Sequence, residues 1–151
     1  SFGMETIIYD PHITFADFRA VKKVSLDTLC KNADIISLHA SFDPLHPQKI
    51  LQKKHFKMMK PSTYFINTAR GELVDEKALV NALRNKWIKG AALDVVSNER
   101  GDGSHLKNNP LLAYARKNKN LIIVPHLGGA TYEAMQITEE FIADLVRKYF
   151  N

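Results

Sequence analysis

Short apolar runs alternate with amphipathic segments along the whole of this 151-residue chain. The apolar runs are rich in β-branched and aromatic residues and are nearly continuous in apolarity, which is typical of strands covered on both faces. They predict strands at residues 6–9, 35–38, 64–66, 91–93 and 121–124, with a further short one at 21–24.

Helical patterns lie between these runs, and most begin at a residue suited to a helix start. Ser25 and Asp75 each stand before a segment with apolar residues at helical spacing. Pro110 suits the first turn of another helix, and Thr131 can cap a long final one. A short helix is also expected at residues 54–59. This order predicts an α/β fold, an open doubly wound parallel sheet with helices on both faces.

Composition narrows the class of protein. Hydrophobic residues make up 45% and charged residues 25%, as in ordinary soluble globular proteins, and no apolar run approaches the ~20 residues that span a bilayer. We therefore expect no membrane span. The net charge of +5 could indicate nucleic-acid binding, but Lys and Arg are scattered, and their densest cluster, residues 49–60, resembles one solvated helical face. We expect no nucleic-acid partner; the alternative predicts an affinity that falls steeply with salt.

Cysteine and histidine usage gives two further expectations. The single cysteine, Cys30, rules out an internal disulfide and fits a reducing, cytoplasmic compartment. It lies on an apolar helical stripe, so we expect a buried structural thiol. Four histidines show no ligand-like spacing with each other or with acidic residues, so no metal site is expected; these are His12, His46, His55 and His105.

A polar residue or cluster follows each main strand. Ligands of open α/β sheets bind beyond the carboxyl ends of the strands, so these groups would converge on one edge. A strand must end in something polar in any case, and for a single residue that structural interpretation is at least as good. Five such positions together indicate a site: Asp10, His39, residues 67–70, Asp94 and His126.

Asp10, in the run IIYDP, has two interpretations. A carboxylate at the end of the second strand of a dinucleotide fold can accept both ribose hydroxyls and repel a 2′-phosphate, which favours NAD over NADP. Asp-Pro is also a common turn start. The phosphate loop G-x-G-x-x-G, which should precede this strand, is absent from the sequence. Either the fold is not a dinucleotide binder, or its first β-turn-α unit has been cut off.

The stretch INTARGELVDEKAL, residues 66–79, resembles the signature of the D-2-hydroxyacid dehydrogenase family, which includes D-3-phosphoglycerate dehydrogenase. ADIISLHAS before it, and GAALDV and PHLGGAT after it, match the family in order and spacing. The resemblance implies a Rossmann-like NAD domain inserted within a substrate-binding domain, usually in a homodimer. The chain, residues 1–151, is similar to most of that NAD domain, beginning after the glycine loop and its helix. Residues 139–151 resemble the start of the helix leading back to the substrate domain.

The resemblance implies three catalytic residues. Arg70 would grip the substrate's carboxylate and keto oxygen, for which a planar guanidinium is suited. His126 would be the general acid and base, and Glu99 the partner that holds its ring. The family's Glu stands in an E-x-E-P-like run, whereas this sequence reads SNERGDGSH, so Glu99 is matched by its offset from Asp94. Formate dehydrogenases resemble this arrangement but have a Gln as the partner of the histidine. A Glu at this position therefore favours a hydroxyacid and its ketoacid as the substrates.

The same resemblance implies the cofactor contacts. Asp94 would lie near the nicotinamide amide, and His39 would be mostly structural. The main chain would approach NAD at Thr68, Ala69, Gly128 and Gly129. A plain turn for the glycines and a satisfied strand-end carboxylate for Asp94 are the alternatives. The expected cofactor-binding residues are Asp10, Ser41, Thr68, Ala69, Arg70, Asp94, His126, Gly128 and Gly129.

These observations predict an NAD-dependent oxidoreductase that transfers a hydride between NAD and a small D-2-hydroxyacid or 2-ketoacid. Lacking the phosphate loop and the substrate domain, the 151 residues alone are expected to be inactive and to bind NAD weakly or not at all. The alternative is a non-enzymatic NAD-responsive binding module, as in the transcriptional corepressors that resemble these dehydrogenases. Such a module need not retain Arg70, Glu99 and His126, so it ranks second.

Overall fold

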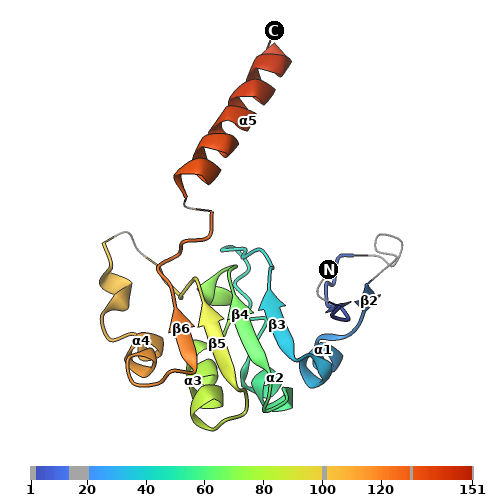
Figure 1. Ribbon diagram of the computed structural model, residues 1–151, viewed down its shortest axis with the longest axis vertical. Coiled ribbons are helices and arrows are strands. Elements are labelled where there is room, and N and C mark those ends of the chain that lie inside the picture. Colours follow the sequence, from blue (N-terminus) through green and yellow to red (C-terminus); the bar gives the residue numbers. More distant parts are fainter. Residues whose placement is uncertain (1–2, 14–20, 100–101, 130, 151) are drawn as a thin grey trace.

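The computed structural model describes residues 3–13, 21–99, 102–129 and 131–150, and the side chains of these except that of residue 150. The described residues form two parallel sheets, seen in Figure 1. The larger one has the strand order β3-β4-β5-β6. Its strands are β3 (Ile35–Leu38), β4 (Tyr64–Asn67), β5 (Gly90–Leu93) and β6 (Leu121–Ile123). The smaller one pairs β1 (Ile7–Ile8) with β2 (Lys22–Lys23).

All strand pairs are parallel, so the carboxyl ends of the four central strands meet at one edge, the upper edge in Figure 1. This confirms the predicted α/β fold with a parallel sheet, and each predicted strand lies within one residue of an observed one at both ends. The polar residues that follow β3, β4, β5 and β6 are thereby brought to the same side of the molecule.

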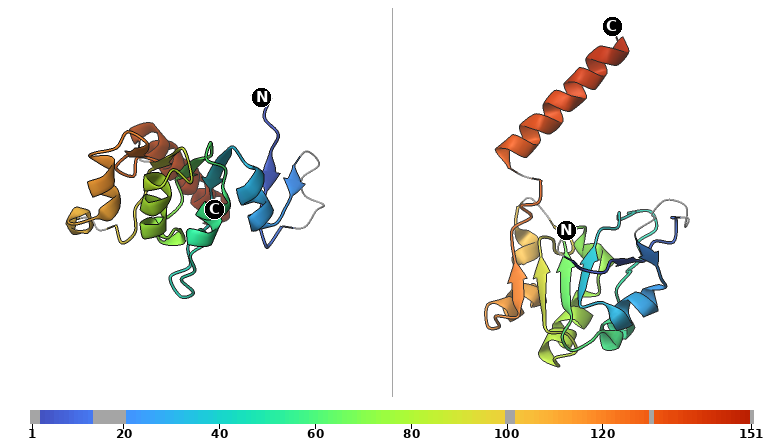
Figure 2. Two further views of the ribbon diagram at one scale, coloured as in Figure 1. Left: turned by 90° about the horizontal axis from the view of Figure 1, so that it is seen from below. Right: turned by 45° about the vertical axis from the view of Figure 1, so that its right-hand side comes forward.

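Four helices form one layer against the larger sheet (Figure 2). They are α1 (Leu26–Asn32), α2 (Lys53–Met58), α3 (Glu76–Arg84) and α4 (Pro110–Ala115), and each packs against the next. The starts of α1 and α3 follow the expected capping chemistry: Ser25 Oγ accepts the N–H of Thr28 at 3.2 Å, and Asp75 Oδ1 accepts that of Ala78 at 3.0 Å. Two short 3₁₀ turns, η2 (Gly71–Leu73) and η3 (Ser104–Leu106), complete the connections.

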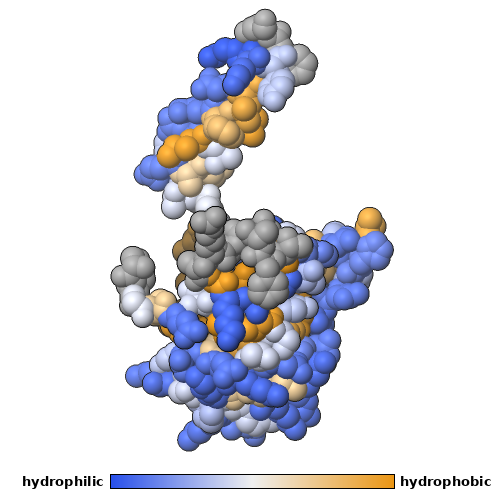
Figure 3. Space-filling model, turned by 90° about the vertical axis from the view of Figure 1, so that its right-hand side faces the viewer, coloured by the Kyte–Doolittle hydropathy of each residue, from blue (hydrophilic) through white to orange (hydrophobic). Residues whose placement is uncertain are grey.

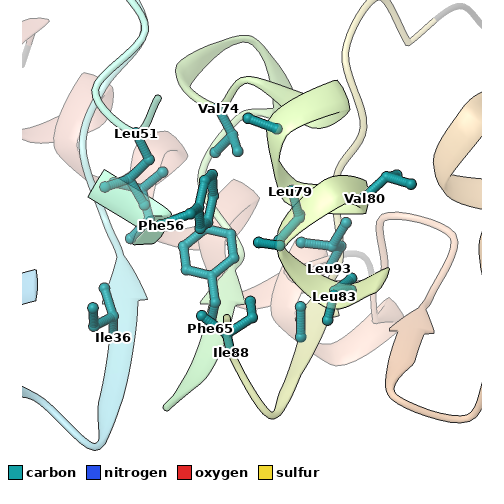
Figure 4. Packing of buried hydrophobic residues seen from close by; sticks show 14 of the residues in the cluster. Ile36, Leu51, Phe56, Phe65, Val74, Leu79, Val80, Leu83, Ile88 and Leu93 are labelled. Carbon is teal, nitrogen blue, oxygen red and sulfur yellow. The ribbon is translucent and has the colours of Figure 1, made fainter. Parts of the chain in front are cut away.

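The core lies between this helical layer and the sheet (Figure 4). Phe56 of α2 and Phe65 of β4 are fully buried and meet edge to face, with ring centroids 5.8 Å apart. Burying side chains of this size stabilises the fold by about 1.5–3 kcal/mol each. Cys30 is also buried, as expected; burial, with the nearby charge of Asp27, raises the pKa of its thiol to about 11, which leaves it protonated and unreactive.

The opposite face of the larger sheet has no helix over it in the described residues. Ile35, Tyr64 and Ile122 point to that side and are 51%, 44% and 60% exposed. Their strand neighbours Ile36 and Phe65 are buried. The expectation of strands covered on both faces is therefore wrong for this part of the chain. An apolar side chain in a strand indicates that this face of the sheet can be buried, but it does not specify which element covers the face.

The last helix, α5 (Tyr132–Phe150), projects from the carboxyl edge of the sheet, away from the body (Figure 1). Thr131 Oγ1 accepts the N–H of Ala134 at 3.2 Å, which is the predicted cap. Apolar side chains gather along one side of α5 and are exposed (Figure 3). In the described ranges, no helix combines the length and the apolar character required to cross a bilayer.

Candidate active site at the carboxyl edge of the sheet

His126 and Glu99 form the central contact at this edge. Nδ1 of His126 lies 2.5 Å from Oε2 of Glu99, although the residues are 27 positions apart. A carboxylate can only accept, so this nitrogen carries a proton and donates it. The other ring nitrogen, Nε2, has no hydrogen-bond partner in the part of the chain that the structure describes. With the two side chains 42% and 30% exposed, the pair is open to a small molecule.

His126 has an unusual backbone. Its φ is +50°, in the left-handed region that residues other than glycine rarely adopt, and its N–H donates to the carbonyl of Val124 at 3.0 Å. This turn follows β6, with Val124 and Pro125 between strand and histidine. Strained conformations of this kind are retained where the surroundings impose them and are common at functional sites.

Asp94 fixes the chain just beyond His126. Its Oδ1 accepts the N–H of Leu127 and its Oδ2 the N–H of Gly128, both at 2.7 Å, and the residue is only 7% exposed. A Cβ at Gly128 would lie 2.8 Å from Asp94 Oδ2, so the carboxylate and this glycine are matched in shape. Both oxygens of Asp94 thus have backbone donors, as the structural interpretation of this strand-end carboxylate expects. Its predicted contact with the nicotinamide amide stays a prediction.

Arg70 borders a cavity of about 320 Å³ between the connections that follow β3 and β4. Its guanidinium donates to the carbonyl of Ala69 at 2.7 Å, and no carboxylate of the described residues forms an ion pair with it. The predicted residues Ser41, Thr68 and Ala69 line the same cavity. The remaining lining residues are His39, Ala40 and Phe42.

The turn that presents Arg70 is held by Asn67, one of the polar residues expected at a strand end, for which the sequence predicted no specific role. Its side chain is buried; Oδ1 accepts the N–H of Ala69 and Nδ2 donates to the carbonyl of Arg70, each at 3.0 Å. An Asn at the last strand position, directly before TARG, was the available signal, because Asn often bonds nearby backbone groups in turns.

Three other predicted positions are structurally simpler. Gly129 has φ +78° and open space around it, as in a plain turn. Asp10 follows β1 on the smaller sheet. Its Oδ1 accepts the N–H of His12 at 2.7 Å, as expected for the start of a turn. It does not line the cavity. His39 pairs its Nε2 with Ser37 Oγ at 2.8 Å, which fits a structural role.

The chemistry of this edge suits a polar ligand that carries an acidic group, because Arg70 has no carboxylate partner among the described residues. The cavity is within the size range of ligand pockets and combines main-chain turns with one cation. A larger hollow, about 450 Å³, lies between α3 and α4 and is lined by none of the predicted site residues, so chemistry favours the smaller one. Over the described ranges, no three His, Cys, Asp or Glu side chains are grouped as metal ligands would be.

Comparison with known proteins identifies the family. Residues 1–128 match the NAD-binding domain of the D-isomer specific 2-hydroxyacid dehydrogenases. A protein of Staphylococcus saprophyticus, provisionally assigned as a 2-hydroxyacid dehydrogenase, is 39% identical over 155 aligned residues, covering 100% of this chain and 45% of that protein. The chain thus spans about half the length of the curated relatives that it matches.

Solved structures agree with this match. The D-lactate dehydrogenase of Aquifex aeolicus, in complex with NAD and lactic acid, aligns with a TM-score of 0.80 at 29% identity, over 98% of this chain and 46% of that one. An acyclic imino acid reductase in complex with NADPH and D-Arg aligns with a TM-score of 0.78 at 29% identity, over 97% and 43%. The chain therefore belongs to the D-isomer specific 2-hydroxyacid dehydrogenase family, in which it corresponds to the NAD-binding domain.

Proposed function

We propose that this domain serves an NAD-dependent dehydrogenase that interconverts a small D-2-hydroxyacid and its 2-ketoacid. The observation that carries the proposal is the 2.5 Å contact between His126 and Glu99 at the carboxyl edge of the sheet. It places an imidazole, held through Nδ1, with Nε2 available for proton exchange. A carbonyl that gains hydride at carbon must gain a proton at oxygen, and this arrangement supplies one.

His126 and Arg70 have separate tasks in this proposal. In the direction of reduction, Nε2 of His126 donates a proton to the keto oxygen, and in oxidation it takes the proton back from the hydroxyl. Glu99 keeps the ring in the tautomer and orientation that this needs. Arg70, which has no carboxylate partner among the described residues, binds the substrate's carboxylate and orients its C2.

The residues present fit NAD in its nicotinamide part. Bound NAD supplies the hydride donor and acceptor. Main-chain groups around Ser41, Thr68 and Ala69 border the cavity and would hold the nicotinamide side, and the turn at Gly128 and Gly129 lets the chain approach closely. The contact with Asp94 is part of the same proposal.

Asp10 would select NAD by bonding the adenosine ribose hydroxyls and repelling a 2′-phosphate. One structural neighbour was solved with NADPH, so the preference is worth measuring directly. Replacing Asp10 with Ala should weaken NADH binding and narrow the preference for NADH over NADPH. If Asp10→Ala keeps the same preference for NADH over NADPH, Asp10 is not one of the residues that bind the cofactor.

The organisation of the sheets supports the proposal that the chain is part of a larger NAD domain and enzyme. An open sheet of the dinucleotide-binding order 3-2-1-4-5-6, with strand 1 taken out, would leave a pair and a separate run. The structure has such a pair, β1-β2, and a separate run, β3-β4-β5-β6, which is one strand longer than the run 4-5-6 of that order. We further propose that the whole protein is a homodimer, that residues 139–151 begin the helix to its substrate domain, and that the 151 residues alone do not turn over substrate.

The test uses the whole protein that carries this domain. NADH fluorescence measures cofactor binding, and a panel of 2-ketoacids measures turnover, with His126→Gln compared with the unmodified protein. We expect the variant to lose turnover by about 10²-fold to 10⁴-fold. Its NADH binding should weaken far less, because His126 is only one of several expected cofactor contacts. Turnover that survives in His126→Gln would refute the assignment of the acid and base. Saturable NADH binding with no turnover of any ketoacid would favour the non-enzymatic binding module instead.

A further inference from the structure

We propose that Glu72 and Glu76 are positioning residues that set the place of the Glu99 carboxylate against the ring of His126. The inference rests on the proposed function of that pair, and it adds the residues that hold Glu99 in place. It concerns the segment 96–99, which carries Glu99 and lies across the connection that follows Arg70.

Three successive backbone N–H groups of this segment each donate to a different glutamate. The N–H of Val96 donates to Glu99 Oε1 at 2.8 Å, that of Ser97 to Glu76 Oε1 at 2.6 Å, and that of Asn98 to Glu72 Oε1 at 2.8 Å. Glu76 and Glu72 are 21 and 26 residues away in sequence, so these bonds tie two distant segments together. Hydrogen bonds from N–H groups to carboxylates are among the stronger ones in proteins.

Glu99 uses its two oxygens for two purposes. Oε1 accepts the Val96 N–H, and Oε2 receives Nδ1 of His126. The direction in which Oε2 points therefore depends on where the backbone at Val96 lies. That position depends in turn on the next two peptide groups, which Glu76 and Glu72 hold.

The backbone of the segment includes one residue in the left-handed region, which Asn adopts more readily than most other residues. Asn98 has φ +58°, in the left-handed region, and its N–H is the one bonded to Glu72. Gly71, beside Glu72, touches the segment so closely that a Cβ there would lie 2.1 Å from the carbonyl carbon of Val96. The connection after Arg70 is thus shaped to receive residues 96–98 and to supply both acceptors.

The environment of Glu76 agrees with a role in the folded site. Burial raises the pKa of its carboxyl group, the bond from Ser97 opposes this, and the neighbouring charges of Glu72 and Lys49 act in opposite directions. Asp75 already caps the start of α3, so the helix start does not need the half-buried carboxylate of Glu76.

The first experiment is NMR on the 151-residue chain. The signature is the His126 Nδ1–H proton and the ¹⁵N shifts of the ring, which report its bond to Glu99. We expect Glu76→Ala and Glu72→Ala to weaken or remove the Nδ1–H signal at temperatures well below unfolding. Glu76→Gln should retain it, because its carboxamide oxygen still accepts the Ser97 N–H. Lys77→Ala, an exposed neighbour on α3, is the matched control.

A merely structural role would lower the unfolding temperature of the alanine variants but leave the signature of the remaining folded chain unchanged, and this would overturn the proposal. Absence of the signature from the unmodified chain would overturn it as well. The second experiment measures the whole enzyme: Glu76→Ala should lower kcat on the order of 10-fold to 100-fold with little change in KM, and Glu76→Gln should recover most of it. An unchanged kcat in Glu76→Ala would also count against the proposal.

The two experiments separate this inference from the proposed function. If His126→Gln remains active while Glu76→Ala still disturbs the His126 signature, the acid and base assignment fails and the positioning stands. If His126→Gln is inactive and Glu76→Ala leaves both signature and kcat unchanged, the positioning fails and the proposed function stands.

Discussion

At the scale of single residues, His55 shows how burial makes a side chain sensitive to pH. It is 4% exposed in α2, and its Nδ1 accepts the N–H of Gln52 at 3.0 Å. Removal from water, reinforced by the charge of Lys54, lowers the pKa of its ring below the ordinary value of 6.5. The neutral ring is therefore part of the folded state.

The lowered pKa of His55 predicts the sign of a pH effect. Above 6.5 the ring is neutral in both folded and unfolded chains; as the pH falls below 6.5, the unfolded chain takes up a proton before the folded one does, and stability is lost. In His55→Gln this loss should disappear, so urea unfolding between pH 7.5 and 5 should show a shallower dependence on pH. The exposed His12 supplies the control variant His12→Gln. An equally steep dependence in His55→Gln would contradict the prediction.

Gly71 is a residue where the absence of a side chain is required by contact. Because a Cβ would lie 2.1 Å from Val96 C and 2.2 Å from Ser97 N, Gly71→Ala must push the two segments apart. We expect a loss of stability of about 1–3 kcal/mol, as for other overpacked sites, measured by urea unfolding. We also expect the His126 Nδ1–H signal to weaken, since the segment that carries Glu99 moves. An alanine variant as stable as the unmodified chain would contradict the prediction, because the two segments could then separate there without loss of stability.

At the scale of elements, β3 offers a direct comparison between the two faces of the sheet. Ile36 is 5% exposed beneath the helical layer, whereas its neighbour Ile35 is 51% exposed on the open face. Ile36→Ala should lower the free energy of unfolding by about 2–5 kcal/mol, and Ile35→Ala by less than about 1 kcal/mol. Each variant is the other's control, because both make the same change in one strand. Equal losses would mean that the open face is covered in solution.

The sequence predicted the elements well because their signals are local. Ser25 and Asp75 cap the helices that follow them, and the strand ends fall where polar residues follow apolar runs. The open face of β3 and β4 could not be predicted, since Ile35 and Ile36 have the same side chain and differ only in what lies over them. Local pattern specifies where a strand begins and ends but not its neighbours.

The candidate site divides in the same way. The strand order brought Asp94 and His126 to one edge, which the alternation of strands and helices predicted. The pairing of His126 with Glu99 came from resemblance to a family, since no local pattern joins residues 27 positions apart. The bonds from residues 97 and 98 to Glu76 and Glu72 were not predicted at all, because they depend on how the segment after β5 lies against η2 and the start of α3.

At the scale of the whole molecule, two apolar surfaces face outward. One is the open face of the larger sheet, and the other is the apolar side of α5, where Ile137, Phe141 and Ile142 are 67%, 62% and 52% exposed. Exposed apolar area of this extent is typical of surfaces that contact something else, or of chains that associate. With a net charge of +5, the chain also repels copies of itself, which opposes association at low salt.

The position of α5 predicts that the rest of the fold does not depend on it. A single helix of 19 residues is only marginally stable in water, and the described side chains of α5 are largely exposed rather than packed on the body. Deleting residues 132–151 should therefore change the free energy of unfolding by less than about 0.5 kcal/mol, while circular dichroism loses helical signal and binding of an apolar dye decreases. A loss of several kcal/mol would show that α5 packs against the body in solution, and that its apolar side is part of the core.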